Sequence, residues 1–225
     1  EKLVEKMFWF NLGELQAMID TFHAEGIERL VMAGKITKTR MFTELKPDPR
    51  LIRVLETLPI RNDDAILKAL AGEFVTEGIH VCDSTTFLDS LLPRRGTLTR
   101  REPTPEELLD IKYGYEIAKK IADLDIGQTV VVKNRAILAV EAIEGTDEAI
   151  LRGGRLGNGQ VTVVKVARPK QDMRFDIPVV GLDTIRTLLQ GRASCLAFEE
   201  KKTMLLDRNE LIALADSENL AIVVI

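Results

Sequence analysis

The chain has 225 residues, of which 45% are hydrophobic and 29% are charged. This apolar fraction excludes a disordered chain, and the length suffices for one large domain or two small ones. The formal net charge of −4 argues against a nucleic-acid partner, because such partners are bound by broadly basic surfaces.

Cysteine and histidine are scarce. Cys82 and Cys195 are too few for a disulfide framework, stand in apolar surroundings and fit core positions in a reducing, cytoplasmic compartment. With only His23 and His80, any metal must be held mainly by carboxylates, which favours a hard ion such as Mg2+. We find no signal peptide and no apolar run near the roughly 20 residues of a membrane span.

The first hundred residues alternate predicted helices and strands, which indicates a parallel, Rossmann-like sheet. The predicted helices cover about 12–25, 48–58 and 63–77, and the predicted buried strands cover 27–33 and 79–82. Lys35, Ser84 and Thr85 follow these strands, where α/β sheets often place ligand contacts. Turn capping explains Ser84 and Thr85 equally well.

Residues 93–105 interrupt this pattern with three prolines, a glycine and four arginines. The break predicts a boundary between an N-terminal domain, residues 1–100, and a C-terminal α/β domain, residues 101–225. The arginines could meet an anionic lipid or a phosphate, and a solvated linker is an equally good reading.

The second half has a different order of elements. Helices are predicted at 105–123, 146–152, 183–190 and 208–215, and strands at 129–132, 136–141, 161–167, 194–198, 203–206 and 220–225. Thr104 and Glu107 form a possible capping box for the first of these helices. Four glycines between 153 and 159 predict a mobile loop.

The most unusual segment, ARPKQDMRFDIPVVG, follows a predicted strand and interleaves carboxylates with cations. Asp172 and Asp176 could supply oxygen ligands to a divalent metal, while arginine grips phosphate in a bidentate fork. The alternative is a solvated loop with surface ion pairs. The strand-end position and the apolar flanks favour the functional interpretation.

A second candidate is AVEAIEGTDEAI, residues 139–150. Glu141 and Glu144 could face a metal, and Thr146 and Asp147 open a helix whose first amides can bind an anion. In the equally good alternative, Thr146 is a plain helix cap and both glutamates are exposed. Together the two segments suit Mg2+-assisted chemistry on a phosphate ester or anhydride.

At these residues the chain resembles a known family. The stretches VMAGKI, DSTTFL, LTRREPT, DIGQTVVVKN, AVEAIEGTD, VVKVARPKQDMRFDIPVVG and LLDRNEL resemble the bacterial UDP-2,3-diacylglucosamine pyrophosphatases of lipid A biosynthesis, of the two-domain α/β type rather than the metallophosphoesterase type. The resemblance runs along nearly the whole chain.

The resemblance implies Mg2+-dependent hydrolysis of a nucleotide-sugar lipid to UMP and 2,3-diacylglucosamine 1-phosphate (lipid X), with water attacking the α-phosphorus. It implies a Rossmann-like N-terminal domain, a distinct C-terminal α/β domain and a substrate held in the cleft between them. It also implies a cytoplasmic protein of Gram-negative bacteria, and leaves room for peripheral contact with the inner membrane and for a homodimer.

The resemblance also assigns residues. The family's essential aspartate falls on Asp172 first and on Asp176 second, because the alignment does not fix which of the two matches. The residues expected to bind diphosphate oxygens are Lys170, Gln171 and Arg174. Glu141, Glu144, Thr146 and Asp147 would contact metal or phosphate.

The chain departs from the family in one place. Family members begin with a glycine-rich strand-turn segment of the Gly-Asn-Gly type at the first strand, and the first residues of this sequence hold no such segment. We therefore expect the first strand-helix-strand portion of the N-terminal domain to be missing. The rival hypothesis is a non-enzymatic module that binds a nucleotide sugar or an anionic lipid.

Overall fold

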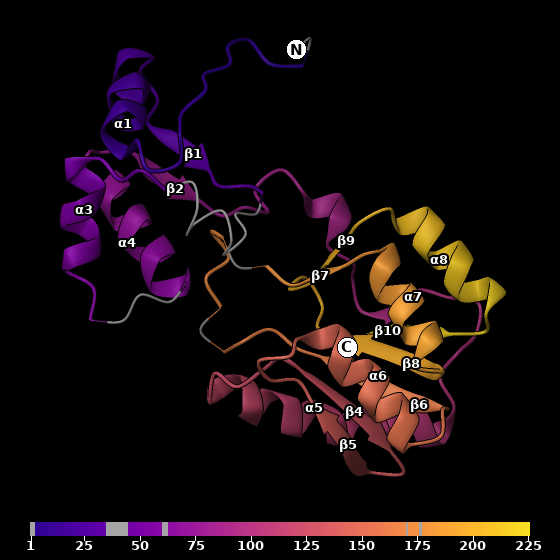
Figure 1. Cartoon of the computed structure of the whole chain (residues 1–225). Coiled ribbons are helices and arrows are strands. Elements are labelled where there is room, and N and C mark those ends of the chain that lie inside the picture. The colour runs from indigo at the N-terminus through magenta and orange to yellow at the C-terminus, as the bar shows by residue number, and fades with distance from the viewer. Residues whose placement is uncertain (1–2, 35–44, 60–62, 170, 176) are drawn as a thin grey trace. The chain divides into compact units, whose positions relative to one another are not determined.

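The computed structural model of the chain describes residues 3–34, 45–59, 63–169, 171–175 and 177–225 (Figure 1). It divides into two compact units. The N-terminal unit comprises Glu1–Thr86 together with Met173–Asp176, and the C-terminal unit comprises Phe87–Asp172 together with Ile177–Ile225. Both units mix helices and strands, so the predicted two-part α/β architecture is confirmed.

In the N-terminal unit, helices pack around a small parallel sheet. Its elements are α1 (Leu15–Ala24), β1 (Arg29–Val31), α3 (Pro49–Glu56), α4 (Asp63–Thr76) and β2 (His80–Cys82). β1 and β2 pair in parallel, with Leu30 opposite Val81. The prediction of a buried strand at 27–33 is wrong in two respects. β1 has only three residues, and Arg29 and Val31 are exposed while Leu30 between them packs against the core of this unit.

The C-terminal unit is built on a six-stranded sheet with the order β3-β10-β8-β6-β4-β5. The strands are β3 (Gly96–Thr97), β4 (Thr129–Lys133), β5 (Ala136–Val140), β6 (Val161–Lys165), β8 (Ala193–Phe198) and β10 (Ala221–Val224). β6, β8 and β10 run parallel, whereas β3, β4 and β5 pair antiparallel with their neighbours. The predicted hairpin of β4 and β5 is confirmed.

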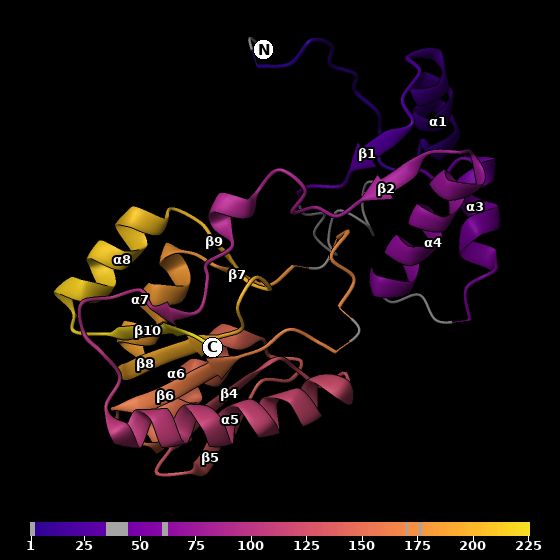
Figure 2. The same ribbon diagram turned by 180° about the vertical axis from the view of Figure 1, so that it is seen from behind.

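Helices cover both faces of this sheet (Figure 2). α5 (Pro105–Asp123) packs on one face, while α6 (Thr146–Leu156), α7 (Leu182–Gln190) and α8 (Arg208–Ser217) pack on the other. A short 3-10 helix, η1 (Asp89–Leu91), precedes the sheet, and a two-stranded sheet pairs β7 (Val179–Val180) with β9 (Met204–Leu205). Cys195 lies in the core, as predicted, and burial there raises the pKa of its thiol to about 12.

The start of α5 is held by a buried charge. Thr104 and Glu107 form the predicted capping box, and Glu107 also accepts two hydrogen bonds from Arg101, at 2.8 and 2.9 Å. Burial alone would raise the pKa of Glu107, but Arg101, the Ser194 hydroxyl and the Thr104 amide hold it below its ordinary value. Arg101 is therefore a structural residue. No helix in the described ranges is both long and apolar enough to cross a membrane.

Gly153 and Gly154 were predicted to lie in a mobile loop. The structure places both inside helix α6, so the prediction is wrong for these two residues. A Cβ at Gly153 would come within 2.5 Å of the Val131 side chain on β4. A Cβ at Gly154 would come within 1.9 Å of the Gly191 carbonyl oxygen. These glycines therefore permit close packing of α6 against the sheet and against the end of α7, rather than chain flexibility.

This packing makes Gly154→Ala strongly destabilising. We expect the free energy of unfolding of the C-terminal unit to fall by about 1–3 kcal/mol, as for other overpacked cores. Chemical denaturation followed by circular dichroism measures the change. Gly181→Ser is the matched control, since a Cβ at Gly181 meets nothing within 4 Å and serine is at least as good a helix cap as glycine. Equal stability of both variants would contradict the close-packing interpretation.

Candidate active site

The charged segment predicted as catalytic begins at one edge of the six-stranded sheet. Ala167, shortly after the end of β6, is fully buried, and Arg168 follows it. The parallel strands β8 and β10 end at the same edge, and β4 begins there because Thr129 pairs with Lys165. The carboxyl ends of parallel strands are the usual ligand-binding edge of α/β sheets.

A buried carboxylate holds the stem of this segment. Glu199 follows β8, is 5% exposed and accepts a 2.6 Å hydrogen bond from the Ala167 amide. Lys119 of α5 donates to both Glu199 oxygens at 3.2 Å and to the Ala167 carbonyl at 2.8 Å. Tyr115, one turn earlier on α5, donates its hydroxyl to Glu199 at 3.3 Å. Helix α5 and strand β8 thus fix the backbone from which the segment starts.

The environment of Tyr115 changes the pKa of its phenol. Burial raises the pKa of Tyr115 above its ordinary value, and the neighbouring Glu199 carboxylate raises it further, both by its charge and by accepting the phenol hydrogen bond. The phenol therefore stays protonated as a donor to Glu199.

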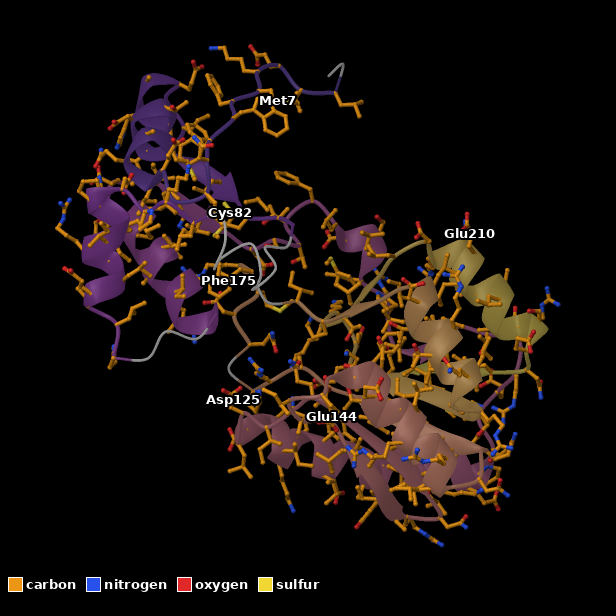
Figure 3. The ribbon with its side chains drawn as sticks, in the orientation of Figure 1. Met7, Cys82, Asp125, Glu144, Phe175 and Glu210 are labelled. Carbon is orange, nitrogen blue, oxygen red and sulfur yellow. The ribbon has the colours of Figure 1, made fainter. Side chains whose placement is uncertain are left out.

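Beyond its stem, the segment forms a closed turn. The Arg168 amide donates to Gln171 Oε1 at 2.9 Å, and the Gln171 amide donates back to the Arg168 carbonyl at 3.1 Å. The Arg168 guanidinium forms an ion pair with Asp125, 3.2 Å away (Asp125 is labelled in Figure 3). Asp172 comes next and is half-buried. Lys35, Lys170 and Asp176, three of the predicted site residues, lie outside the described residues.

The EAIEGTD block brings three polar side chains together at the start of α6. Glu141 Oε1 accepts from the Thr146 hydroxyl at 2.7 Å, and Lys165 Nζ donates to the same Thr146 oxygen at 3.1 Å. The other Glu141 oxygen accepts from the Gln128 amide at 3.2 Å. This cluster links β5, β6 and α6 at the same sheet edge as the charged segment, so two separate predicted blocks meet the edge together.

The other carboxylates of that block, Glu144 and Asp147, lie outside this cluster. Glu144 pairs with Arg152, which also donates to the Val140 carbonyl at 2.8 Å (Glu144 is labelled in Figure 3). Its own backbone amide, and then Arg152, lower the pKa of Glu144 below its ordinary value. Asp147 is exposed in the first turn of α6. The structure therefore groups Glu141 with Thr146, and groups Glu144 with Arg152.

In the N-terminal unit the two predicted hydroxyl residues contact protein atoms. Ser84 Oγ lies 2.6 Å from the Met32 carbonyl and also donates to the Arg174 carbonyl. The amide and hydroxyl of Thr85 donate to Asp83 Oδ1 at 3.0 and 2.7 Å. The turn-capping alternative is thus realised by Thr85, whereas the Ser84 hydroxyl bonds carbonyls that are distant in the chain. Arg174, which belongs to this unit, places its guanidinium 5.5 Å from the Phe175 ring.

The described residues contain no group of three or more His, Cys, Asp and Glu side chains arranged to hold a metal. Mg2+ rarely uses such a cage, because it keeps several waters and binds one or two carboxylates together with substrate phosphates. Asp172, a half-buried carboxylate in a loop at a strand end, fits a site of that kind.

Sequence reasoning missed Tyr115, Lys119, Lys165 and Glu199. A signal for one of them was present, since Glu199 is a charged residue directly after the continuous apolar run of β8. The spacing of Tyr115 and Lys119 places them on one face of α5, but nothing local indicates which strand they meet.

Two family models match the sequence. The LpxI N-terminal domain matches residues 1–91 and the LpxI C-terminal domain matches residues 94–223. The protein named UDP-2,3-diacylglucosamine pyrophosphatase LpxI from Caulobacter vibrioides is 31% identical over 217 residues, an alignment that covers 92% of this chain and 77% of that protein. Ser84 falls in the N-terminal match, and Glu141, Asp172 and Glu199 fall in the C-terminal match.

The contacts of Glu199 predict the titration of Tyr115. In a Tyr113→Phe background, which leaves Tyr115 as the only tyrosine, Glu199→Gln removes the neighbouring charge. We expect the pKa of Tyr115 to fall toward 10.0, its ordinary value, in an ultraviolet absorbance titration. Glu200→Gln, which removes the next carboxylate in the chain, should leave it unchanged. An unaltered pKa in Glu199→Gln would mean that burial alone raises it.

Proposed function

Because the chain belongs to the LpxI family, we propose that it hydrolyses UDP-2,3-diacylglucosamine to UMP and 2,3-diacylglucosamine 1-phosphate in lipid A biosynthesis. The observation that carries the proposal is the match to both family domains, together with 31% identity to a relative named for this activity. The charged segment at the sheet edge supports it, since it concentrates carboxylate and guanidinium groups suited to a diphosphate.

In the proposed reaction, water attacks the α-phosphorus of the diphosphate. A new bond forms between the water oxygen and phosphorus, and the bond from phosphorus to the bridging oxygen breaks. The sugar phosphate leaves with that electron pair, and the water proton passes to a carboxylate and then to solvent. The leaving group is a stable phosphate, so the site does not need a strong general acid.

We assign the carboxylate role to Asp172 first and to Asp176 second. Arg174 and Lys170 would neutralise the diphosphate oxygens, and the neutral amide of Gln171 would help to orient them by donating hydrogen bonds. Glu141 and Thr146, joined through their hydrogen bond at the start of α6, would contact the substrate or its metal from the same sheet edge.

Mg2+ dependence is part of the proposal, with Asp172 and Asp176 as the first candidate ligands and Glu141, Glu144 and Asp147 as further ones. A bound Mg2+ would neutralise phosphate oxygens and lower the pKa of the attacking water. Glu144 would first have to leave Arg152, which makes it the weakest of these candidates.

The acyl chains of the proposed substrate indicate where in the cell the protein acts. A lipid with two chains stays in a membrane, so we also propose that the protein acts in the cytoplasm in peripheral contact with the inner membrane. Formation of a homodimer stays a prediction.

The first test supplies UDP-2,3-diacylglucosamine and Mg2+ in 18O-labelled water. We expect UMP and lipid phosphate as products, with the label in UMP by mass spectrometry, and loss of turnover on chelation that added Mg2+ restores. Label in the lipid phosphate would contradict attack on the α-phosphorus. Tight substrate binding without any turnover would instead favour the rival binding module.

The second test separates the two aspartates. We expect Asp172→Asn to lower kcat by about 10²- to 10⁴-fold, the usual contribution of an acid-base group, with an unchanged circular dichroism spectrum. Asp183→Asn is the matched control, because the Asp183 side chain is 93% exposed on α7 and contacts only Arg186 among the described residues. An active Asp172→Asn beside an inactive Asp176→Asn would transfer the role to Asp176.

A further inference from the structure

The short segment that follows Asp172 is held by the N-terminal unit. The Ser84 amide donates to the Met173 carbonyl at 3.0 Å, and the Ser84 hydroxyl donates to the Arg174 carbonyl. Both carbonyls belong to the stretch Met173–Asp176, which is part of that unit although the chain on either side is part of the other. A single serine therefore binds two consecutive peptide groups of the segment.

An apolar contact adds to these hydrogen bonds. Phe175 packs against the core of the N-terminal unit, which is formed by buried residues of α1, α3, α4 and β2 such as Ile19 and Phe74 (Phe175 is labelled in Figure 3). The Arg174 guanidinium lies over the Phe175 ring, 5.5 Å from its centre. The side chain of Phe175 thus resists withdrawal of the segment, while Ser84 fixes its backbone.

Ser84 is itself rigidly placed. It lies two residues after the end of β2, and its hydroxyl also lies 2.6 Å from the carbonyl of Met32, which follows β1. Its neighbour Thr85 is fixed by two hydrogen bonds to Asp83. One hydroxyl proton is shared between the Met32 and Arg174 carbonyls, so the ends of β1 and β2 and the segment meet at one atom.

We propose that Ser84 is a positioning residue for the reaction, one that acts through Asp172 rather than on the substrate; the kinetic part of this inference rests on the proposed hydrolysis. Consecutive Cα atoms are about 3.8 Å apart, so fixing Met173 and Arg174 restricts where Asp172 can lie. The Ser84 hydroxyl, which the sequence predicted to bind substrate, instead holds the loop that carries the Asp172 carboxylate.

The kinetic test compares Ser84→Ala with Thr86→Ala in the full chain. Thr86 is the matched control, because its hydroxyl bonds within the same turn, to the Asp83 carbonyl. We expect Ser84→Ala to lower kcat by about 10- to 100-fold with little change in KM, since a displacement of about 1 Å can cost about 10²-fold. Ser84→Thr, which keeps the hydroxyl, should restore most of kcat, and Thr86→Ala should match the wild type.

Hydrogen exchange supplies a readout that does not depend on activity. We expect amides of residues 171–175 to exchange faster in Ser84→Ala, while amides of α1 keep their wild-type rates. If α1 also exchanges faster, the variant has lost its core, and Ser84→Cys, which has a weaker donor of similar size, takes its place.

Each outcome decides the assignment. Unchanged exchange over 171–175 overturns the anchoring role of the Ser84 hydroxyl, and faster exchange with an unchanged kcat overturns its positioning role. A full-length wild-type protein without turnover would defeat the proposed function, and the exchange rates would still decide whether the Ser84 hydroxyl holds the segment.

Discussion

The candidate site depends on one buried charge, the carboxylate of Glu199. Removing a carboxylate from water is costly unless donors replace the water, and here Lys119, Tyr115 and the Ala167 amide do so. These donors come from α5 and from the end of β6, so satisfying the charge requires that the helix and two strands meet at one point. The backbone after β6 is fixed as a consequence, and the charged segment starts from a defined place.

The approach of α5 to the sheet is what allows this contact. Gly114 faces the sheet, and a Cβ there would come within 2.8 Å of both Val132 and Val164. The missing side chain lets the helix lie close, so that the adjacent Tyr115 and, one turn later, Lys119 reach Glu199 after the end of β8. On the other face, Gly153 lets α6 lie close to the sheet and Gly154 lets it lie close to the end of α7. Helices therefore pack closely on both faces of the sheet.

Much of this fold could be predicted from local pattern. The capping box of α5, the β4–β5 hairpin and the final strand follow from periodicity and turn chemistry, which depend on neighbours in the chain. The glycines of α6 could not be interpreted this way, because glycine is used both for freedom and for close approach. Only the neighbour that faces the helix, Val131 or Gly191, separates the two uses.

The residues of the candidate site also divide into those that the local sequence pattern predicts and those that it does not. Charge concentration identified the segment with Gln171 and Asp172 and the block with Glu141 and Thr146, because unusual composition is visible in a sequence. The partners Lys119, Lys165 and Glu199 were missed, since strand register and helix placement create those contacts. Ser84 was identified as a polar residue at a strand end, but whether its hydroxyl faces a ligand or a carbonyl depends on a segment about 90 residues away in the chain.

A net charge of −4 opposes an anionic substrate only where the acidic groups are unpaired, and near the candidate site they are paired. Glu199 is matched by Lys119, Glu144 by Arg152 and Asp125 by Arg168, all in the C-terminal unit. Paired charges of opposite sign leave little field beyond a few ångströms, and unpaired surface charges farther than about 10 Å are screened at physiological salt. The potential that a diphosphate meets is therefore set by the few groups next to it. The total count of acidic residues describes solubility rather than the site.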